Sequence, residues 1–192
     1  MEKLIKNIAS HVQLTDKEEK LLLSKVNVKK IKKGEYLLRS GEICRYQNFV
    51  LSGCIKTFYL ERNGDQHVVS FDVENYWTGD LFSFINQTPA HFNVSCIEDS
   101  ELIQISHDNI EILYKEIPKL ERLFRILIQN AYVSSQMRVI DNIRLTAQEK
   151  YLKFVAKYPT LENRVPQYMV ASYIGITAEF LSKIKRKILT NS

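Results

Sequence analysis

Hydrophobic and polar residues along this chain change their spacing twice, which divides it into three kinds of structure. Leu4, Ile5 and Ile8 form a short apolar stripe at helical spacing, which predicts an N-terminal helix. Thr15 and Glu18 have the spacing of a capping box, in which each side chain accepts a hydrogen bond from the other residue's backbone. A second helix is therefore expected to begin there, and shorter segments follow it.

These shorter segments are rich in β-forming residues, and turn signals separate them at intervals of about one strand. The pair Asn63-Gly64 lies between two such segments and predicts a hairpin with a type I′ turn. Further strands are expected at Val94–Glu98 and Leu102–Ser106, and many short antiparallel strands at this spacing indicate a jelly roll or sandwich. The other turn signals are Lys33-Gly34, Ser40-Gly41 and Ser52-Gly53.

Helical spacing returns with a short helix over Asp108–Tyr114, and the longest predicted helix then runs from Pro118 to about Ile143. A seam of residues three and four apart follows this helix. We expect it to be a dimer interface, because an amphipathic helix between two compact units can pair with its copy. The alternative is that the stripe packs on the β unit. The expected interface residues are Leu120, Phe124, Leu127, Ala131 and Ser134, and the seam continues through Arg138 and Asp141.

A hinge is predicted at Arg144-Leu145, and a further helix begins at a second capping box formed by Thr146 and Glu149. The pair Tyr158-Pro159 is expected to end this helix. Its apolar residues should give the C-terminal unit a small core of its own. These residues are Tyr151, Leu152, Phe154 and Val155.

A helix, a tight turn and a second helix are indicated near the C-terminal end. Pro166 suits the first helical position, Gly175 tolerates the positive φ of a sharp turn, and Thr177 can cap the second helix. Leu181 and Ile184 fall on one face of that helix and are expected to pack on the first. The opposite face is polar and basic, as in a helix that enters a DNA groove. An ordinary helical hairpin with a solvated face has the same pattern.

Positive charge is concentrated beside this motif. Residues 144–192 contain nine Lys or Arg and three Asp or Glu, a net charge of +6. The whole chain has 27 Lys or Arg and 22 Asp or Glu, a net charge of +5, so residues 1–143 carry −1. This asymmetry is expected of a module that neutralises phosphates, and it favours DNA binding over an ordinary hairpin.

Composition excludes several other classes of protein. No apolar run approaches the ~18 residues of a membrane span. The N-terminal segment has neither the apolar stretch nor the small-residue cleavage site of a signal peptide. Cys44, Cys54 and Cys96 are an odd number without C-x-x-C spacing. They indicate reduced thiols in a cytoplasmic protein rather than a disulfide framework or a zinc site.

The order of a short helical lead, a β roll, a long helix and a helix-turn-helix resembles the Crp–Fnr family of bacterial transcription regulators. The resemblance implies an α+β fold with a cyclic-nucleotide-binding-like β roll over 1–117, a dimerisation helix over 118–143 and a helix-turn-helix domain over 144–192. It also implies a homodimer on a two-fold-symmetric site in double-stranded DNA, with RNA polymerase as a partner. The segments that carry it are KKGEYLLRSGE at 32–42, FVLSGCIKTFYL at 49–60, GDLFSF at 79–84 and GITAEFLSKIKRKI at 175–188.

The resemblance also assigns the DNA contacts, because the first turns of the second motif helix enter the major groove in this family. Glu179 can accept from a cytosine amino group and Lys183 can donate to guanine. Family members often continue into a two-stranded wing, which is expected to be absent or truncated here because the chain stops at Ser192. The expected base or phosphate contacts are Thr177, Ala178, Glu179, Ser182, Lys183, Arg186 and Lys187.

A cyclic nucleotide is bound in this family by a Gly-Glu pair and, about ten residues later, an Arg that neutralises the phosphate. Here Gly79-Asp80 stands at the pair, and Ala90 followed by His91 stands at the Arg position. We therefore expect no cofactor and no tight binding of cyclic AMP or cyclic GMP, so that the pocket is vestigial or serves another effector. The residues expected to line it are Tyr76, Trp77, Gly79, Asp80, His91, Ser135 and Gln136.

Other sensing chemistries and one rival class can be weighed by residue type. An iron–sulfur sensor needs four cysteine ligands, more than this chain contains, whereas a haem sensor through His67 or His91 stays open. The rival class is an enzyme, such as a cupin-like β roll with a helical protein-interaction tail. A cupin metal site uses a His-x-His pair, which the four histidines do not form, so neither a metal site nor a catalytic residue is expected.

Overall fold

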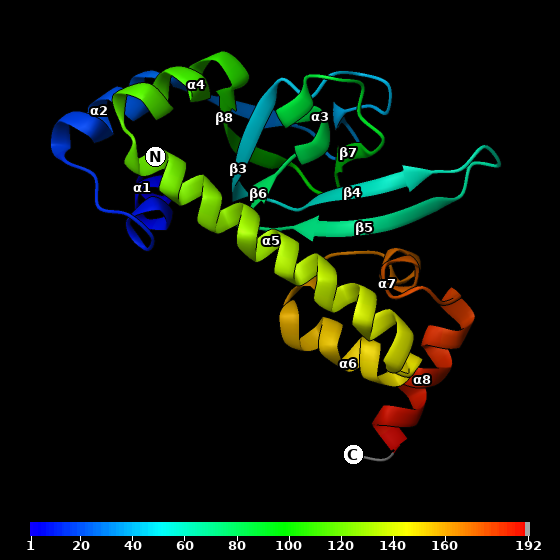
Figure 1. Ribbon diagram of the computed structural model, residues 1–192. Helices are drawn as coiled ribbons and strands as arrows, with labels where there is room; N and C mark the ends of the chain where they lie inside the picture. The colour runs from blue at the N-terminus through cyan, green and yellow to red at the C-terminus, as the bar shows by residue number, and fades with distance from the viewer. Residues whose placement is uncertain (191–192) are drawn as a thin grey trace.

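The computed structural model describes residues 1–190, and Figure 1 shows a β roll beside N-terminal helices, with one long helix running from there to the C-terminal helices. This arrangement confirms the α+β fold expected from the sequence. The elements of the first half are α1 (Glu2–Ala9), α2 (Asp16–Ser24), β1 (Val26–Ile31), β2 (Tyr36–Leu38), β3 (Tyr46–Ser52), β4 (Ile55–Leu60), β5 (Gln66–Asp72), β6 (Trp77–Thr78) and α3 (Leu81–Asn86). Those of the second half are β7 (Asn93–Cys96), β8 (Ser100–Ser106), α4 (His107–Glu116), α5 (Lys119–Arg144), α6 (Ala147–Lys157), η1 (Leu161–Asn163), α7 (Gln167–Ile174) and α8 (Ala178–Thr190).

Two four-stranded antiparallel sheets form the β roll. One has the strand order β1-β8-β3-β6 and the other the order β2-β7-β4-β5. Neighbours in space are thus mostly distant in sequence, and β1 pairs with β8 from Val26 opposite Ile105 to Ile31 opposite Ser100. Large side chains such as Phe49 are fully buried in the core of the roll. The predicted short antiparallel strands are therefore confirmed.

Both predicted capping boxes are present. The hydroxyl of Thr15 accepts from the Glu18 amide at 3.3 Å, and the Glu18 carboxylate accepts from the Thr15 amide at 2.7 Å. Thr146 and Glu149 make the same pair of contacts at 3.3 and 2.8 Å. Each box satisfies backbone amides that have no partner within the helix, so α2 and α6 begin where the sequence predicts.

The β4–β5 hairpin forms as predicted, but its turn is not type I′. The Gly64 amide donates to the Glu61 carbonyl at 3.0 Å, and the Glu61 amide donates to the Asp65 carbonyl at 2.9 Å. Gly64 has a φ of +94°, whereas Asn63 does not have a positive φ. A type I′ turn needs two positive φ values, so this loop is a type I turn followed by a left-handed glycine.

The inner face of α5 carries the seam that was predicted to be the dimer interface. Leu120 is buried in the β-roll core, and Phe124 and Leu127 pack against that core. The β roll of the same chain buries Leu120 but covers Phe124 and Leu127 only in part, so the assignment of these side chains to a dimer interface stays a prediction. Ala131 and Ser134, the other two, are exposed.

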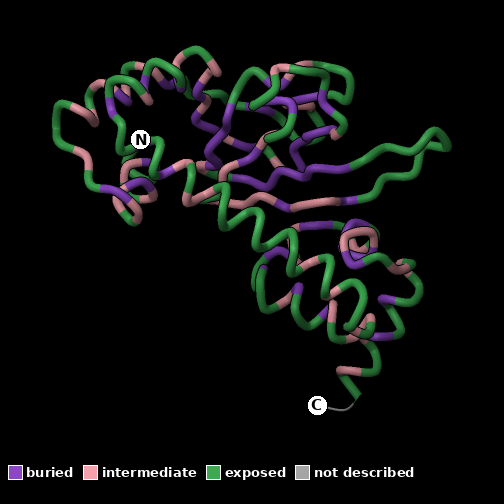
Figure 2. Tube along the Cα trace, viewed as in Figure 1, coloured by how far each residue is buried: buried purple, intermediate pink, exposed green. Residues whose placement is uncertain are grey.

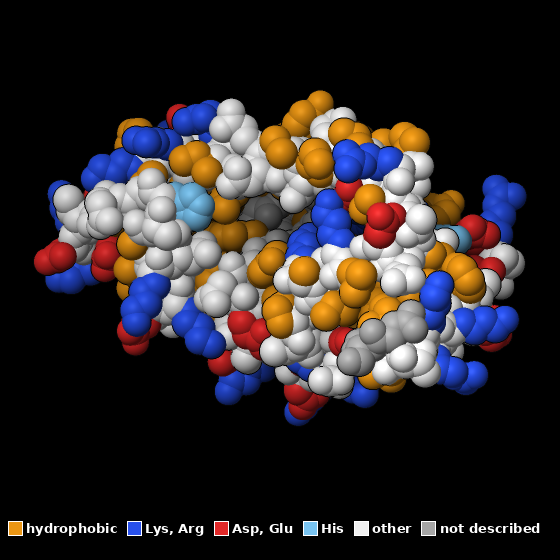
Figure 3. All heavy atoms as spheres, turned by 90° about the horizontal axis from the view of Figure 1, so that it is seen from below, with side chains coloured by type: hydrophobic (Ala, Val, Ile, Leu, Met, Phe, Trp, Pro, Cys, Tyr) orange, Lys and Arg blue, Asp and Glu red, His pale blue; other side chains and the backbone are white. Residues whose placement is uncertain are grey.

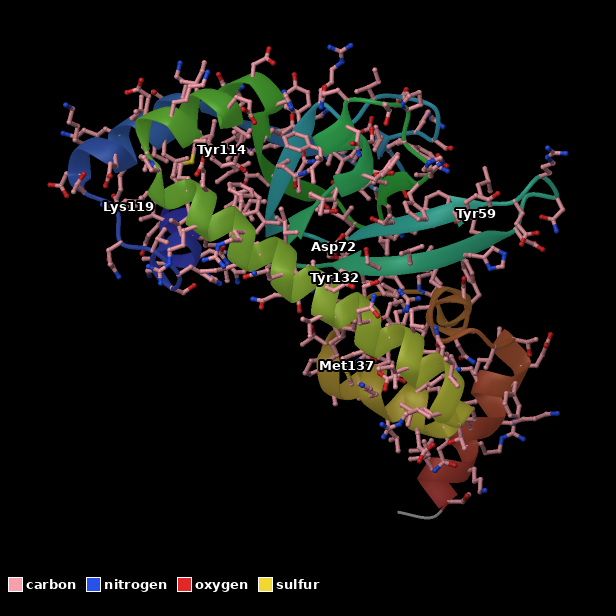
Figure 4. All side chains as sticks on the ribbon, in the orientation of Figure 1. Tyr59, Asp72, Tyr114, Lys119, Tyr132 and Met137 are labelled. Atoms are coloured by element: carbon pink, nitrogen blue, oxygen red, sulfur yellow. The ribbon has the colours of Figure 1, made fainter. Side chains whose placement is uncertain are left out.

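An apolar stripe on the outer face of α5 is exposed instead. Tyr132 is 65% exposed, Val139 54% and Ile143 83%. The stripe consists of Ile128 and these three residues, which follow one another at intervals of four, seven and four positions. They therefore project from one side of a helix with 3.6 residues per turn. At about 100° per residue, that side lies roughly 80–140° around the helix from Leu120, on a neighbouring face. Figure 2 shows the exposed course of α5 beyond the β roll, and Figure 4 labels Tyr132 on it.

The C-terminal helices have a hydrophobic cluster distinct from the main core of the β roll, as predicted, but this cluster also includes residues of the β roll such as Phe71. Phe71 of β5 is fully buried, and its ring centre lies 6.0 Å from that of Phe154, 6.3 Å from Tyr158 and 5.5 Å from Tyr173. This aromatic cluster joins β5 to α6 and α7. The division of the chain into three units stays a prediction. Of the expected core residues in α6, Tyr151 and Phe154 are buried, Val155 is half-buried and Leu152 is exposed.

Polar contacts hold α7 against the edge of the sheet. Ser172 Oγ accepts from the Val68 amide at 2.9 Å and donates to the Gln66 carbonyl at 2.8 Å, so it pairs with backbone groups of the edge strand β5. The guanidinium of Arg138 in α5 donates to carbonyl groups of β5 and to the Tyr173 carbonyl at 3.1 Å. It also lies 4.4 Å from the centre of the Tyr173 ring. Arg138 thus ties α5, β5 and α7 together.

A second arginine joins the two halves of the chain. Arg164, just before α7, donates to Glu74 at 2.9 and 3.0 Å and to Glu98 at 2.8 and 3.1 Å. These paired hydrogen bonds to Glu98 and Glu74 raise the pKa of Arg164 above its usual value. Both carboxylates belong to turns of the β roll, so Arg164 fixes the loop that leads into α7.

Candidate nucleic-acid interface and effector sites

The turn between α7 and α8 has the geometry of a helix-turn-helix. The Ile176 amide donates to the Ala171 carbonyl at 3.0 Å, and the Gly175 amide to the Ser172 carbonyl at 3.2 Å. Gly175 has a φ of +77°, so the chain leaves α7 through a Schellman motif that glycine adopts without strain. Thr177 Oγ1 accepts from an amide in the first turn of α8, as predicted.

The two faces of α8 have opposite character. Leu181 and Ile184 are buried in the aromatic core together with Val170, Ala171 and Ile174 of α7, which confirms the predicted packing. This packing leaves the other face outward. Of the predicted DNA contacts, Ala178 is half-buried, whereas Thr177, Glu179, Ser182, Lys183, Arg186 and Lys187 are exposed.

Some polar groups on α8 already have partners within the protein. Gln167 Nε2 of α7 donates to Ser182 Oγ at 2.6 Å and to the Ala178 carbonyl at 3.1 Å. The Nζ of Lys185 forms an ion pair with Glu162 of η1 at 2.6 Å. Phe180 is also exposed on α8. It was not predicted to contact DNA, although it lies three residues before Lys183 and therefore on the same side of the helix.

The residues predicted to line an effector pocket are not brought together. Asp80 is buried and caps α3, where its Oδ1 accepts from the Ser83 amide at 3.0 Å and its Oδ2 from the His91 amide at 3.2 Å. Both carboxylate oxygens are therefore used within the fold. Ala90 is buried, whereas the His91 ring is exposed and lies 5.3 Å from the ring of Phe82.

The other predicted pocket residues lie elsewhere. Trp77 packs its ring 5.4 Å from Phe49 and 5.2 Å from Phe124, and it is a core contact of α5. Tyr76 is exposed, and Ser135 and Gln136 are exposed on α5. Gly79 borders a cavity of about 120 Å³. Sites that enclose small ligands usually measure about 300–1,000 Å³, so this cavity is smaller than such sites, and the expectation that no cyclic nucleotide binds tightly stays a prediction.

A larger cleft of about 450 Å³ lies between α5, α6 and α7. The sequence did not predict it, because its residues come from three helices whose relative positions no local pattern specifies. Figure 3, a view from below, shows Lys and Arg side chains beside a hollow in that face of the molecule. Residues that line the cleft include Met137, Arg138, Lys150, Lys153, Phe154 and Lys157.

Other reactive groups are either buried or scattered. The three cysteines are free and buried, and burial raises the pKa of Cys54 to about 12 and that of Cys96 to about 11, which keeps these thiols protonated. Within residues 1–190, no group of three or more His, Cys, Asp or Glu side chains is arranged to hold a metal ion. No helix in that range is long and apolar enough to span a bilayer.

Comparison with known proteins agrees with this geometry. Residues 28–116 match the family described as the cyclic nucleotide-binding domain. The chain is 23% identical to Electron transport regulator A of Shewanella oneidensis over 169 residues, which are 81% of this chain and 66% of that protein. It is also 23% identical, over 171 residues, to the Fumarate and nitrate reduction regulatory protein of Vibrio cholerae, with the same coverage. The chain thus spans just under two thirds of the length of these relatives.

The solved structures include close matches in fold. FixK2 from Bradyrhizobium japonicum superimposes with a TM-score of 0.76 at 15% identity, covering 86% of this chain and 85% of that one. At this level of identity the match supports the fold alone. Together, the relatives and the folds support the resemblance to the Crp–Fnr family.

Proposed function

We propose that this chain, which resembles the Crp–Fnr regulators in sequence and in fold, is a sequence-specific DNA-binding transcription regulator that acts as a homodimer. The observation that carries the proposal is α8, whose apolar side is buried on α7 while its polar and basic side faces outward. A helix held in this way can enter the major groove. The two relatives are named as a regulator and a regulatory protein, and RNA polymerase is the further partner that the proposed role implies.

Two kinds of DNA contact are proposed for α8. Glu179 and Lys183 lie in its first turns and are exposed, so they can reach base edges, where Lys donates to guanine and Glu accepts from cytosine. Arg186 and Lys187 are exposed further along the helix and are placed for phosphates. Ser182 is already hydrogen-bonded to Gln167, so a phosphate contact by its hydroxyl would compete with that bond.

Replacement of Lys183 by Ala and of Lys187 by Ala should have different effects on DNA binding. Lys183→Ala should cost about 1–3 kcal/mol on the preferred site and relax specificity at one base pair. Lys187→Ala should weaken binding to all sequences alike and reduce the slope of affinity against salt by about one unit. Fluorescence anisotropy with the preferred site and with a scrambled site, each at several salt concentrations, separates the two effects.

The preferred site comes from selection on a random DNA pool. Enrichment of a two-fold-symmetric sequence supports the proposal. If no sequence is enriched by the pure protein or in the presence of host-cell extract, which supplies any required effector, then the proposal fails. Lys17→Ala, an exposed lysine on α2 far along the chain from the motif, is the matched control and should leave both affinities unchanged.

The second copy in the proposed dimer is placed on the apolar stripe of α5. Ile128, Tyr132, Val139 and Ile143 are all exposed within the described residues, although the helix they belong to is buried at Leu120 and Leu123. Pairing of two such helices would bury both stripes around one two-fold axis. It would also set two α8 helices on the same DNA, in agreement with the paired half-sites that helix-turn-helix dimers bind.

Cyclic AMP and cyclic GMP are proposed not to be effectors of the β roll. The supporting observations are the use of both Asp80 oxygens within the fold and the small buried Ala90 at the position expected for a cation. Titration calorimetry with either nucleotide should therefore show no tight binding. A dissociation constant in the low micromolar range, about −8 kcal/mol, would contradict this prediction.

A further inference from the structure

The cleft between α5, α6 and α7 combines several cations with few anions. Lys150, Lys153 and Lys157 are spaced three and four apart, so they lie on one side of α6 and line the cleft. Arg138 lines it from α5. Asp141 is the one acidic side chain among the described lining residues, which therefore carry four positive charges and one negative charge.

The cations of the cleft are only partly compensated. Lys153 pairs with Asp141. Lys150 donates to the Asn142 carbonyl at 3.2 Å, and the Nζ of Lys157 lies 4.9 Å from the centre of the Tyr158 ring. Neither Lys150 nor Lys157 forms an ion pair with a carboxylate in the described part of the chain, although burial raises the pKa of the Asp72 carboxyl and the charge of Lys157 is close enough to lower it in part. A bound anion would relieve the repulsion between these like charges.

The cleft is also partly apolar, which distinguishes it from a row of solvated lysines. Met137 on α5 and Phe154 on α6 are among its apolar lining residues, and Figure 4 labels Met137 where α5 passes α6. Its volume of about 450 Å³ is sufficient for a small organic molecule. An occupant that fits both properties has an apolar or aromatic body and more than one negative charge.

We propose that this cleft binds a phosphorylated small molecule with an aromatic body, of which a nucleoside monophosphate is the simplest representative. The phosphate would lie among Lys150, Lys153 and Lys157, and the body against Met137 and Phe154. The site is distinct from the small cavity beside Gly79 in the β roll, with which it has no lining residue in common.

The position of the cleft also gives the ligand a route to the DNA-binding helices. Arg138 lines the cleft and at the same time holds β5 and the Tyr173 carbonyl of α7. A ligand that attracts or displaces this guanidinium would change how α7 is held on the β roll. This regulatory part rests on the proposed function, whereas ligand binding itself does not.

Calorimetric titration of the full chain with AMP and with GMP tests the proposal. At low salt, we expect at least one of them to bind with a micromolar dissociation constant, and both adenosine and inorganic phosphate to bind at least tenfold more weakly than AMP or GMP. The double variant Lys150→Gln, Lys157→Gln should lose at least tenfold in affinity for the nucleotide. The control Lys17→Gln, Lys20→Gln changes two exposed lysines of α2 and should bind as the wild type does.

Three results would overturn the proposal. These are the absence of binding by AMP and GMP at millimolar concentration, inorganic phosphate binding as tightly as the nucleotide, and unchanged nucleotide affinity in the double variant. A double variant that loses DNA affinity but keeps nucleotide affinity would assign these lysines to the DNA backbone instead. Because nucleotide binding is measured without DNA, its failure is distinguishable from failure of the proposed DNA binding.

Discussion

Replacement of Val139 and Ile143 by Glu is expected to convert the protein from a dimer to a monomer. Both side chains are more than half exposed and belong to the apolar stripe, so the single chain loses little when they change. In the proposed dimer, the two carboxylates of each chain would be buried without partners. Sedimentation at micromolar concentration measures the change of mass.

The same double variant should weaken binding to a two-fold-symmetric DNA site by about 10²–10⁴-fold, because each α8 would then bind its half-site without the other. Ser134→Glu is the matched control. It adds one carboxylate, against two in the double variant, at an exposed position of α5 that borders the cleft rather than the stripe, and it should leave the dimer intact.

Either of two outcomes would contradict this assignment. A wild-type protein that sediments as a monomer would remove the dimer altogether. If Ser134→Glu dissociated the dimer and the double variant did not, the interface would instead be the seam that was expected from the sequence and that contains Ser134. Leu127→Asp cannot decide between these interfaces, because Leu127 packs on the β roll and its replacement should destabilise the fold itself.

Phe71→Ala is expected to destabilise the β roll and the C-terminal helices together, by about 3–5 kcal/mol. The Phe71 ring is fully buried and contacts aromatic rings of both α6 and α7, so its removal leaves a cavity where the two halves of the chain meet. Urea unfolding measures the loss. The fluorescence of Trp77, the single tryptophan, reports on the β roll, and circular dichroism reports mainly on the helices.

In the wild-type protein, the two signals should change in one coincident transition, because the aromatic cluster around Phe71 joins both parts. In the Phe71→Ala variant both transitions should move to lower urea. Phe82→Ala makes the same chemical change at an exposed site on α3 and should cost less than about 1 kcal/mol. If Phe71→Ala shifted the circular dichroism transition but left Trp77 fluorescence unchanged, the joining of both parts by this cluster would be disproved.

This aromatic cluster gives a physical basis for communication between the β roll and the DNA-binding helices. α7 is the first helix of the motif and packs directly on β5 through Phe71, Ser172 and Arg138. A rearrangement of β5 therefore cannot leave α7 in place without breaking buried contacts. Because α8 packs on α7, its outward face would move with it.

Short-range features of this protein could be read from the sequence, because their causes lie within a few residues. The capping boxes at Thr15 and Thr146 need only two side chains three residues apart. Gly175 marks the end of α7, since a left-handed residue is needed there. The buried and exposed sides of α8 follow from helical spacing once its start at Thr177 is known.

Features that depend on which surfaces meet were decided only by the tertiary structure. α5 has apolar residues on two sides, and periodicity alone could not say that the β roll covers Leu120 while Tyr132 stays exposed. Asp80 matches a family ligand position in sequence, yet its neighbours in space use both of its oxygens.

The aromatic cluster and the cationic cleft also depend on which surfaces meet. Phe71 and Phe154, for example, are 83 positions apart in the chain but pack their rings together. The sequence determined where each helix and strand forms and which side chains could be buried. The packing of α5, α6 and α7 on β5 determined which of them are buried, since burial depends on partners that local patterns do not encode.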